Sequence, residues 1–135
     1  MPDLTRVSDN NEKKTISVVA AVVEHGQVSN TDNVVLWNIP GRCLITRAYA
    51  VTEVPGQAAL TADLGFAGGN ELMNDVDLDG TPNTVDDVLT TPVWTGTGKQ
   101  VTANFSADPT AGRFVFMIEY IEYTLGNGKL LNYSA

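Results

Sequence analysis

The residue types and spacing best suited to chemistry occur in one acidic segment, DVDLDGTPNTVD, at residues 75–86. Its oxygen-bearing residues fall on the ligand positions of a calcium loop, and Gly80 falls where such a loop turns sharply. Calcium takes about six to eight oxygen ligands, and clustered carboxylates repel one another without a cation. The calcium ligands that this spacing predicts are Asp75, Asp77, Asp79, Thr81 through its carbonyl, Asn83 and Asp86.

A solvated acidic loop is the alternative, and the sequence favours it over calcium. The spacing resembles the calcium loops of EF-hand and dockerin domains, but Asp86 is shorter than the Glu of an EF-hand and Pro82 replaces an apolar residue. No helical pattern clearly flanks the segment, and turns also prefer Asp, Gly, Pro and Asn. Calcium is therefore the one cofactor hypothesis, and it stays open.

Groups suited to catalysis are sparse in the rest of the chain. His25 is the only histidine, which excludes a multi-histidine metal site, and it is predicted to lie in an exposed turn. Glu119 and Glu122, three residues apart on a predicted strand, point to opposite faces. Cys43 lies in an apolar run and is predicted to be a buried thiol. Because the sequence also lacks a nucleophile elbow and a phosphate-binding glycine loop, we expect no catalytic residues and no enzyme.

The charge of the chain limits its partners. It has 135 residues and a formal net charge of −8. Phosphate backbones and anionic membrane surfaces repel such a chain, so neither nucleic acid nor a membrane is an expected partner. No apolar run is long enough for a transmembrane helix, and the N-terminal residues lack the apolar core of a signal peptide. We therefore expect the protein to fold in a cytoplasm.

Short runs rich in Val, Ile, Thr and aromatic residues, separated by Gly, Pro and Asn turns, predict strands rather than helices. Residues 70–90 are predicted to be irregular. The predicted strands cover residues 15–24, 33–39, 42–53, 58–66, 93–94, 100–106 and 113–124. The last strand is apolar on both faces and is predicted to be central. In the third strand, the heavier alternate residues are predicted to face the core: Cys43, Ile45, Arg47, Tyr49 and Val51.

These strands predict an all-β fold, an antiparallel, jelly-roll-like β-sandwich in a single domain over residues 15–135. The polar residues 1–14 cannot support a core, and they are predicted to form a flexible N-terminal arm that orders on a partner. The runs 15–24 and 113–124 carry more apolar side chains than one core face needs, which predicts a homo-oligomer.

Aromatic residues give a second hypothesis, a carbohydrate site. Stacked aromatic side chains can form a sugar platform, although aromatic residues in strands are more often core or subunit contacts. The candidates are Trp37, Trp94, Tyr120, Tyr123 and Tyr133.

The order of these segments resembles a known class of protein. VVLWNIPGR is followed by CLITRAYAVTEV, ALTADLGFAGGN, the acidic NDVDLDG and the closing TAGRFVFMIEYIEY. Over about residues 15–125 this pattern resembles small virion structural proteins of tailed bacteriophages, in particular capsid decoration, or cement, proteins. The resemblance implies a β-sandwich on the capsid exterior, assembled in the host cytoplasm, that binds the major capsid protein and stabilises the head.

The resemblance also implies self-association, with a trimer favoured over a dimer, and it carries over no catalytic residue. The alternative function is a carbohydrate- or receptor-binding β-sandwich module of a phage tail or fibre, or of a secreted protein.

Overall fold

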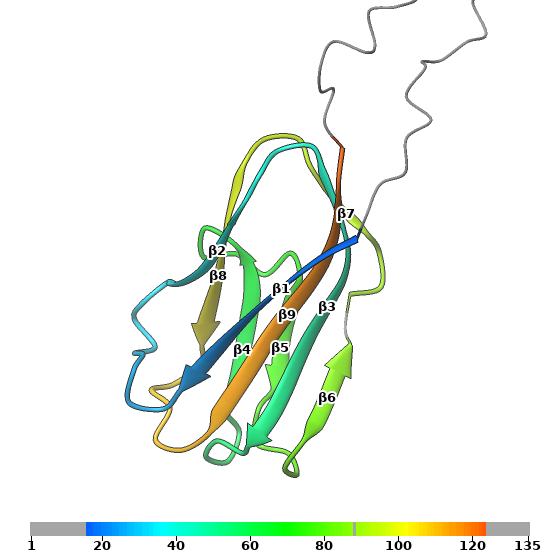
Figure 1. Ribbon diagram of the computed structural model, residues 1–135. Coiled ribbons are helices and arrows are strands. Elements are labelled where there is room, and N and C mark those ends of the chain that lie inside the picture. The colour runs from blue at the N-terminus through cyan, green and yellow to red at the C-terminus, as the bar shows by residue number, and fades with distance from the viewer. Residues whose placement is uncertain (1–15, 88, 124–135) are drawn as a thin grey trace, which may run out of the picture.

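The computed structural model describes residues 16–87 and 89–123, and every regular element within them is a β-strand. The strands are long where Val, Ile and Phe are dense, and short where Asp and Gly interrupt the chain. In chain order (Figure 1) they are β1 (Ile16–Glu24), β2 (Val34–Ile39), β3 (Cys43–Val54), β4 (Thr61–Phe66), β5 (Met73–Asp77), β6 (Thr84–Asp87), β7 (Val93–Thr95), β8 (Lys99–Phe105) and β9 (Arg113–Glu122).

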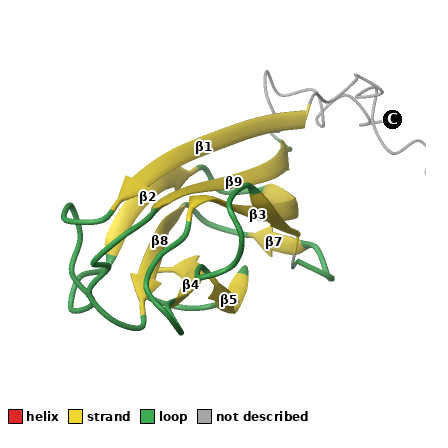
Figure 2. Ribbon diagram, turned by 90° about the horizontal axis from the view of Figure 1, so that it is seen from below, coloured by secondary structure: helices red, strands yellow, loops and turns green. Residues whose placement is uncertain are grey.

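The strands form two antiparallel sheets that pack face to face (Figure 2). The first, called here the β9 sheet, has the order β1-β9-β3-β6, and the short β7 also pairs with β3. The second, called the β8 sheet, has the order β2-β8-β4-β5. With β7 set aside, the remaining strands cross between the sheets in the order of a jelly roll. The predicted all-β, jelly-roll-like sandwich is confirmed.

The core lies between the two sheets, where alternate residues of the long strands meet. Phe114, Phe116 and Ile118 of β9 point inward and have no exposed surface. Phe105 of β8 packs against both phenylalanines, with ring centroids 6.0 and 6.3 Å apart. Burial of a side chain of this size contributes roughly 1.5–3 kcal/mol, so these rings are a main source of the sandwich's stability.

β9 is the central strand of its sheet. It pairs along its length with β1 on one side and with β3 on the other. Its inward residues are buried, while the outward Val115 and Met117 are half-buried. The prediction of a central strand from apolar residues on both faces is confirmed.

The face assignment predicted within β3 is wrong beyond Ile45. The pairing of β3 with β9 shifts register between Ile45 and Arg47, and this β-bulge reverses the alternation that follows. Cys43 and Ile45 face the core as predicted. After the bulge, the residues that face outward are Arg47, Tyr49 and Val51, and the buried ones are Ala48, Ala50 and Thr52.

The prediction that residues 70–90 are irregular is also wrong, because β5 and β6 lie in this range. Both strands are short, and each lies at the edge of its sheet. An edge strand tolerates acidic residues that would be costly in a central strand, because one side stays open to water. The polar sequences MNDVD and TVDD therefore form strands by pairing with β4 and β3, and not by their own composition.

β1 begins and β9 ends at the same end of the sandwich (Figure 1). Ile16 pairs with Ile121, so these two points of the chain are neighbours. The predicted arm, residues 1–14, lies outside the described residues. Within the described part of the chain, no helix is long and apolar enough to cross a membrane.

Candidate interaction surface

The six predicted calcium ligands are spread over two sheets and the loop between them. Asp75 and Asp77 lie on β5 in the β8 sheet, whereas Asp86 lies on β6 in the β9 sheet. The connection between these strands holds the other three, Asp79, Thr81 and Asn83. A calcium loop wraps its ligands around one ion, and this segment instead runs from one layer of the sandwich to the other.

Some of these residues already have partners within the protein. The Asp79 carboxylate accepts a hydrogen bond of 2.7 Å from the backbone N–H of Ala59. The backbone N–H of Asn83 donates to the carbonyl of Thr52 at 2.6 Å. Across residues 16–87 and 89–123, no three His, Cys, Asp or Glu side chains gather as a metal site requires. This spread favours the solvated loop, and the calcium site stays a prediction.

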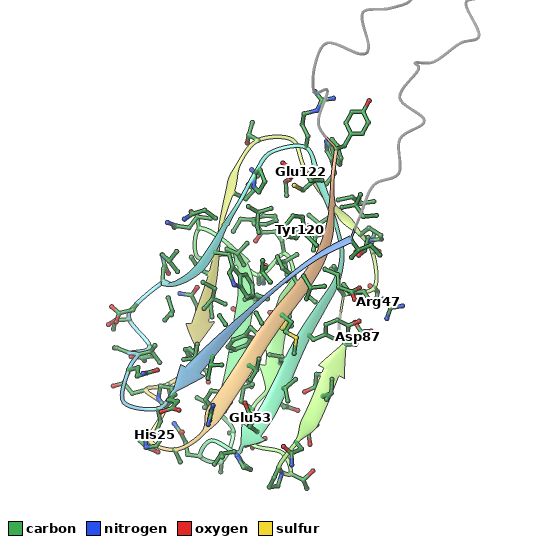
Figure 3. The ribbon with its side chains drawn as sticks, viewed as in Figure 1. His25, Arg47, Glu53, Asp87, Tyr120 and Glu122 are labelled. Carbon is green, nitrogen blue, oxygen red and sulfur yellow. The ribbon has the colours of Figure 1, made fainter. Side chains whose placement is uncertain are left out.

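Cys43 and His25, the single cysteine and the single histidine of the sequence, lie near opposite ends of β9. Cys43 is fully buried and pairs with Glu122. His25 is exposed in the turn after β1, where its Nδ1 lies 3.2 Å from the carbonyl oxygen of Gly112 (Figure 3). Burial, and then the charge of Glu122, raise the pKa of the Cys43 thiol, while a side-chain hydrogen bond with Thr95 acts in the opposite direction. The thiol is therefore a poor nucleophile at neutral pH.

The aromatic residues predicted to form a sugar platform do not share one face. Trp37 on β2 and Tyr120 on β9 pack against the core. Trp94 on β7 is exposed on the outside of the β9 sheet. Tyr123 directly follows β9, and Tyr133 lies outside the described residues. This separation removes the main argument for a carbohydrate platform.

The outer faces of the two sheets differ in polarity. Outward positions of the β8 sheet carry polar residues such as Asp63, Gln100 and Asn104. Soluble proteins rarely leave a large apolar patch exposed without a partner. The outer face of the β9 sheet is therefore the candidate functional surface. Among the exposed large hydrophobic residues of the described chain, Val35 lies on β2, and the others lie on strands of the β9 sheet: Ile16, Val18, Val22, Val54, Val85 and Trp94.

Strand pairing aligns four valines in one row across this face. Val22 of β1 pairs with Val115 of β9. Val115 also pairs with Val51 of β3, which in turn pairs with Val85 of β6. Ala20, Met117, Tyr49 and Asp87 form the next row, which Asp87 ends on the edge strand β6. We call the seven apolar residues of these two rows the central patch: Val22, Val115, Val51, Val85, Ala20, Met117 and Tyr49.

Charged residues border the central patch at the end where β9 begins. The Nε of Arg113 lies 3.6 Å from a carboxylate oxygen of Glu24 and 3.7 Å from one of Glu53. All three side chains are at least a third exposed. Exposed pairs of this kind contribute only about 0–1 kcal/mol to stability, so their main effect is to fix the positions of charges beside the patch.

A second group of charges borders the other side of the central patch. A guanidinium nitrogen of Arg47 lies 3.1 Å from the carboxylate of Asp87 (Figure 3). The Nε of Arg47 lies 3.7 Å from the carboxylate of Glu119. A hydrogen bond with the side chain of Tyr49, and then the nearby charges, raise the pKa of Arg47. The central patch is thus an apolar area between two groups of ion pairs.

A second apolar row lies beyond Arg47, where β1 begins and β9 ends. Ile16 pairs with Ile121, Ile121 with Leu44, and Leu44 with Trp94. Ile16 is 60% exposed and Trp94 is 53% exposed. We call these four residues the terminal patch.

Reasoning from the sequence found the apolar surplus in β1 and β9 but missed the rows. Simple alternation along β3 places Val51 in the core, and only the bulge after Ile45 turns it outward. The acidic composition of β6 conceals the strand that supplies Val85. The polar Thr46–Arg47 step within an otherwise apolar strand is the signal that could have marked the bulge.

Comparison with known proteins identifies the fold. No family model and no curated protein matches the chain. A chain of the cyanophage Pam1 capsid asymmetric unit is similar, with a TM-score of 0.62 and 16% identity, covering 89% of this chain and 95% of that chain. A chain of the Ralstonia phage GP4 capsid has a TM-score of 0.59 and 18% identity, covering 90% and 92% of the two chains.

A chain of the acid-stable capsid of Helicobacter pylori bacteriophage KHP30 is also similar, with a TM-score of 0.57 and 10% identity, covering 81% of this chain and 91% of that chain. This chain shares its fold with proteins of phage capsids. The resemblance to phage virion proteins is thereby confirmed at the level of the fold. Because coverage is high in both directions, each match is to a chain of similar length, and not to one domain of a much longer chain.

Proposed function

We propose that this protein is a bacteriophage capsid decoration protein, which binds the outer surface of the shell and stabilises the head. It acts by binding and has no catalytic role. The observation that carries the proposal is the match over nearly the whole chain to chains of similar length in three phage capsids. A separate jelly roll of this size is suited to attach to a shell that a major capsid protein builds.

The charge of the chain supports a place on the exterior. Packaged DNA fills the inside of a phage head, and its phosphates repel a chain with a formal net charge of −8. On the outside, the same charge keeps the protein soluble before it attaches. Virion location and assembly in the host cytoplasm are parts of this proposal.

The terminal patch is our candidate for the contact with the major capsid protein. It exposes Ile16 and Trp94 at one end of the sandwich. Exposed aromatic and aliphatic side chains that fill a partner's pockets contribute most of the binding energy in typical interfaces. Residues 1–14 precede Ile16 in the chain, and their polar composition suits a segment that orders only on a partner.

A receptor- or carbohydrate-binding module is the second candidate, and the exposure of Trp94 is the observation that favours it. One exposed aromatic side chain is enough for stacking on a sugar but gives little specificity. Binding of the purified protein to a glycan array, lost in Trp94→Ala, would support this candidate over capsid attachment.

Co-sedimentation of the purified protein with phage capsids that lack it tests the proposal. We expect saturable binding and a higher temperature for capsid rupture. Trp94→Asp should weaken binding at least tenfold, because it places a charge in the contact. Val35→Asp is the matched control, because Val35 is 50% exposed on the opposite sheet, and it should bind like the unaltered protein. Absence of binding at any protein concentration would refute the proposal.

A further inference from the structure

We infer that the central patch is the interface with a second copy of this chain in a two-fold symmetric dimer. The inference concerns the free protein and does not depend on attachment to a capsid. It assigns a second copy of the chain as the binding partner of this sheet face, and it favours a dimer over the trimer that the resemblance implies.

The composition of the central patch is that of an interface core with a charged rim. Seven apolar side chains lie in two adjacent rows, Asp87 ends the second row at the β6 edge, and ion pairs border the rows on both sides. Val22 and Val85, at the two ends of the valine row, are 50% and 59% exposed. Specific interfaces combine an apolar centre with a polar rim in the same way. A second copy would take all of these side chains out of water together.

The order of the rows makes this face complementary to itself. Consider a two-fold axis that lies in the interface and runs across the strands, between the valine row and the Met117 row. It places each strand over the same strand of the second copy, running in the opposite direction. The valine row of one copy then lies over the Met117 row of the other. Val115 then lies over Met117 of the second copy, and Val51 lies over Tyr49 of the second copy. At the β6 edge, Val85 lies over Asp87 of the second copy. Across the other strands, small and large apolar side chains alternate, which is how the facing sheets of a sandwich interdigitate.

The same axis brings opposite charges together. It exchanges the row of Arg113 with the row of Glu119, and both residues lie on β9. Arg113 of each copy therefore faces Glu119 of the other. On β3, Arg47 of each copy faces Val54, whose partner on β9, Arg113, lies 3.7 Å from Glu53. The Arg113–Glu119 contact occurs twice in the dimer, so the Arg113 side chain of each copy meets a carboxylate of the other.

The area of the face fits a reversible dimer. Three strands with about seven residues each and the four residues of β6, at about 4.8 Å between strands and about 3.4 Å per residue, give roughly 410 Å² in projection. A corrugated surface has more accessible area than its projection. Specific interfaces bury about 800 Å² per partner, and transient ones bury less. We therefore expect a monomer–dimer equilibrium in the micromolar range.

Sedimentation velocity of the full chain from about 1 to 200 µM tests the dimer. Val22→Lys should leave only monomer over this range, because it puts a charge into the apolar rows. Val35→Lys is the matched control: both valines are 50% exposed, but Val35 lies on the β8 sheet. It should retain the equilibrium of the unaltered protein. Circular dichroism melts of both variants show whether the fold is kept.

A charge-reversal series tests the symmetry. Arg113→Glu and Glu119→Arg should each raise the dissociation constant about tenfold or more. The double variant should recover most of that loss, because it restores opposite charges across the interface. The two residues are six positions apart on β9, about 20 Å, so they cannot interact within one copy. Recovery in the double variant therefore reports an intermolecular contact.

Three results would overturn the inference. A monomer at 200 µM would remove the dimer, and a trimer would remove the two-fold axis. Equal losses of dimer in Val22→Lys and Val35→Lys would mean that the central patch is not the interface. None of these results decides whether the protein binds capsids, which co-sedimentation measures separately.

Discussion

Gly112 is the residue where the backbone most clearly demands glycine. It lies just before β9 with φ +113°, a conformation that other residues rarely adopt, and its carbonyl accepts a hydrogen bond from the N–H of His25 at 3.1 Å. A Cβ at this position would overlap the ring of Phe114, one of the central core side chains.

Gly112→Ala should therefore destabilise the fold by about 2–3 kcal/mol, since backbone strain and overpacking act together. Thermal melts followed by circular dichroism should show a Tm lower by roughly 5–10 °C. Gly96→Ala is the control: an added Cβ there meets nothing within 4 Å, and Tm should change little. Equal effects of the two changes would contradict the structure around Gly112.

The residue types predicted the burial of some side chains correctly and the burial of others wrongly. The apolar run around Cys43 predicts a buried thiol, and the thiol is fully buried. The outward orientation of Arg47 and Val51 could not be predicted, because the sheet face to which they point depends on a bulge that forms only when β3 pairs with β9. A single sequence does not contain that pairing, and one displaced residue turns every later side chain of a strand to the other face.

Among the elements, the long apolar strands are those that the sequence predicts most closely. β1, β3 and β9 match their predicted ranges to within one or two residues, because dense Val, Ile and Phe specify strands locally. β5 and β6 are edge strands that depend on their neighbours, and acidic residues conceal them. The candidate surface spans β1, β9, β3 and β6, so it emerges only after all four are paired.

The β5–β6 segment gives a prediction about calcium. Because Asp75 and Asp77 lie in one sheet and Asp86 in the other, we expect Tm to be the same in millimolar calcium and in chelator. Asp77→Ala should show the same indifference to calcium. A rise in Tm with calcium that is lost in Asp77→Ala would instead support the calcium loop, through the stabilisation that binding to the folded state provides.

At the scale of the whole molecule, deletion of the N-terminal residues tests whether they contribute to folding or to capsid binding. All nine described strands and the core lie within residues 16–123, so deletion of residues 1–14 should change Tm by only a few degrees. The same deletion should weaken co-sedimentation with capsids, because we assign this polar segment to the partner surface. Unfolding of the truncated chain would show that these residues belong to the fold.

The two apolar patches divide the surface between two roles. The central patch is assigned to a second copy, and the terminal patch is assigned to the shell. The Arg47, Asp87 and Glu119 ion pairs lie between them and keep the two areas distinct. A dimer formed through the central patch would present two terminal patches, one at each end, because the two-fold axis reverses the strand direction of the second copy.

Quantitative mass spectrometry of purified virions is the most direct test of the central claim, the role in capsid decoration. A decoration protein occupies repeated sites on the shell, so we predict many copies per virion in a fixed ratio to the major capsid protein. Absence from the purified virion, or a few copies that separate with the tail, would contradict the account.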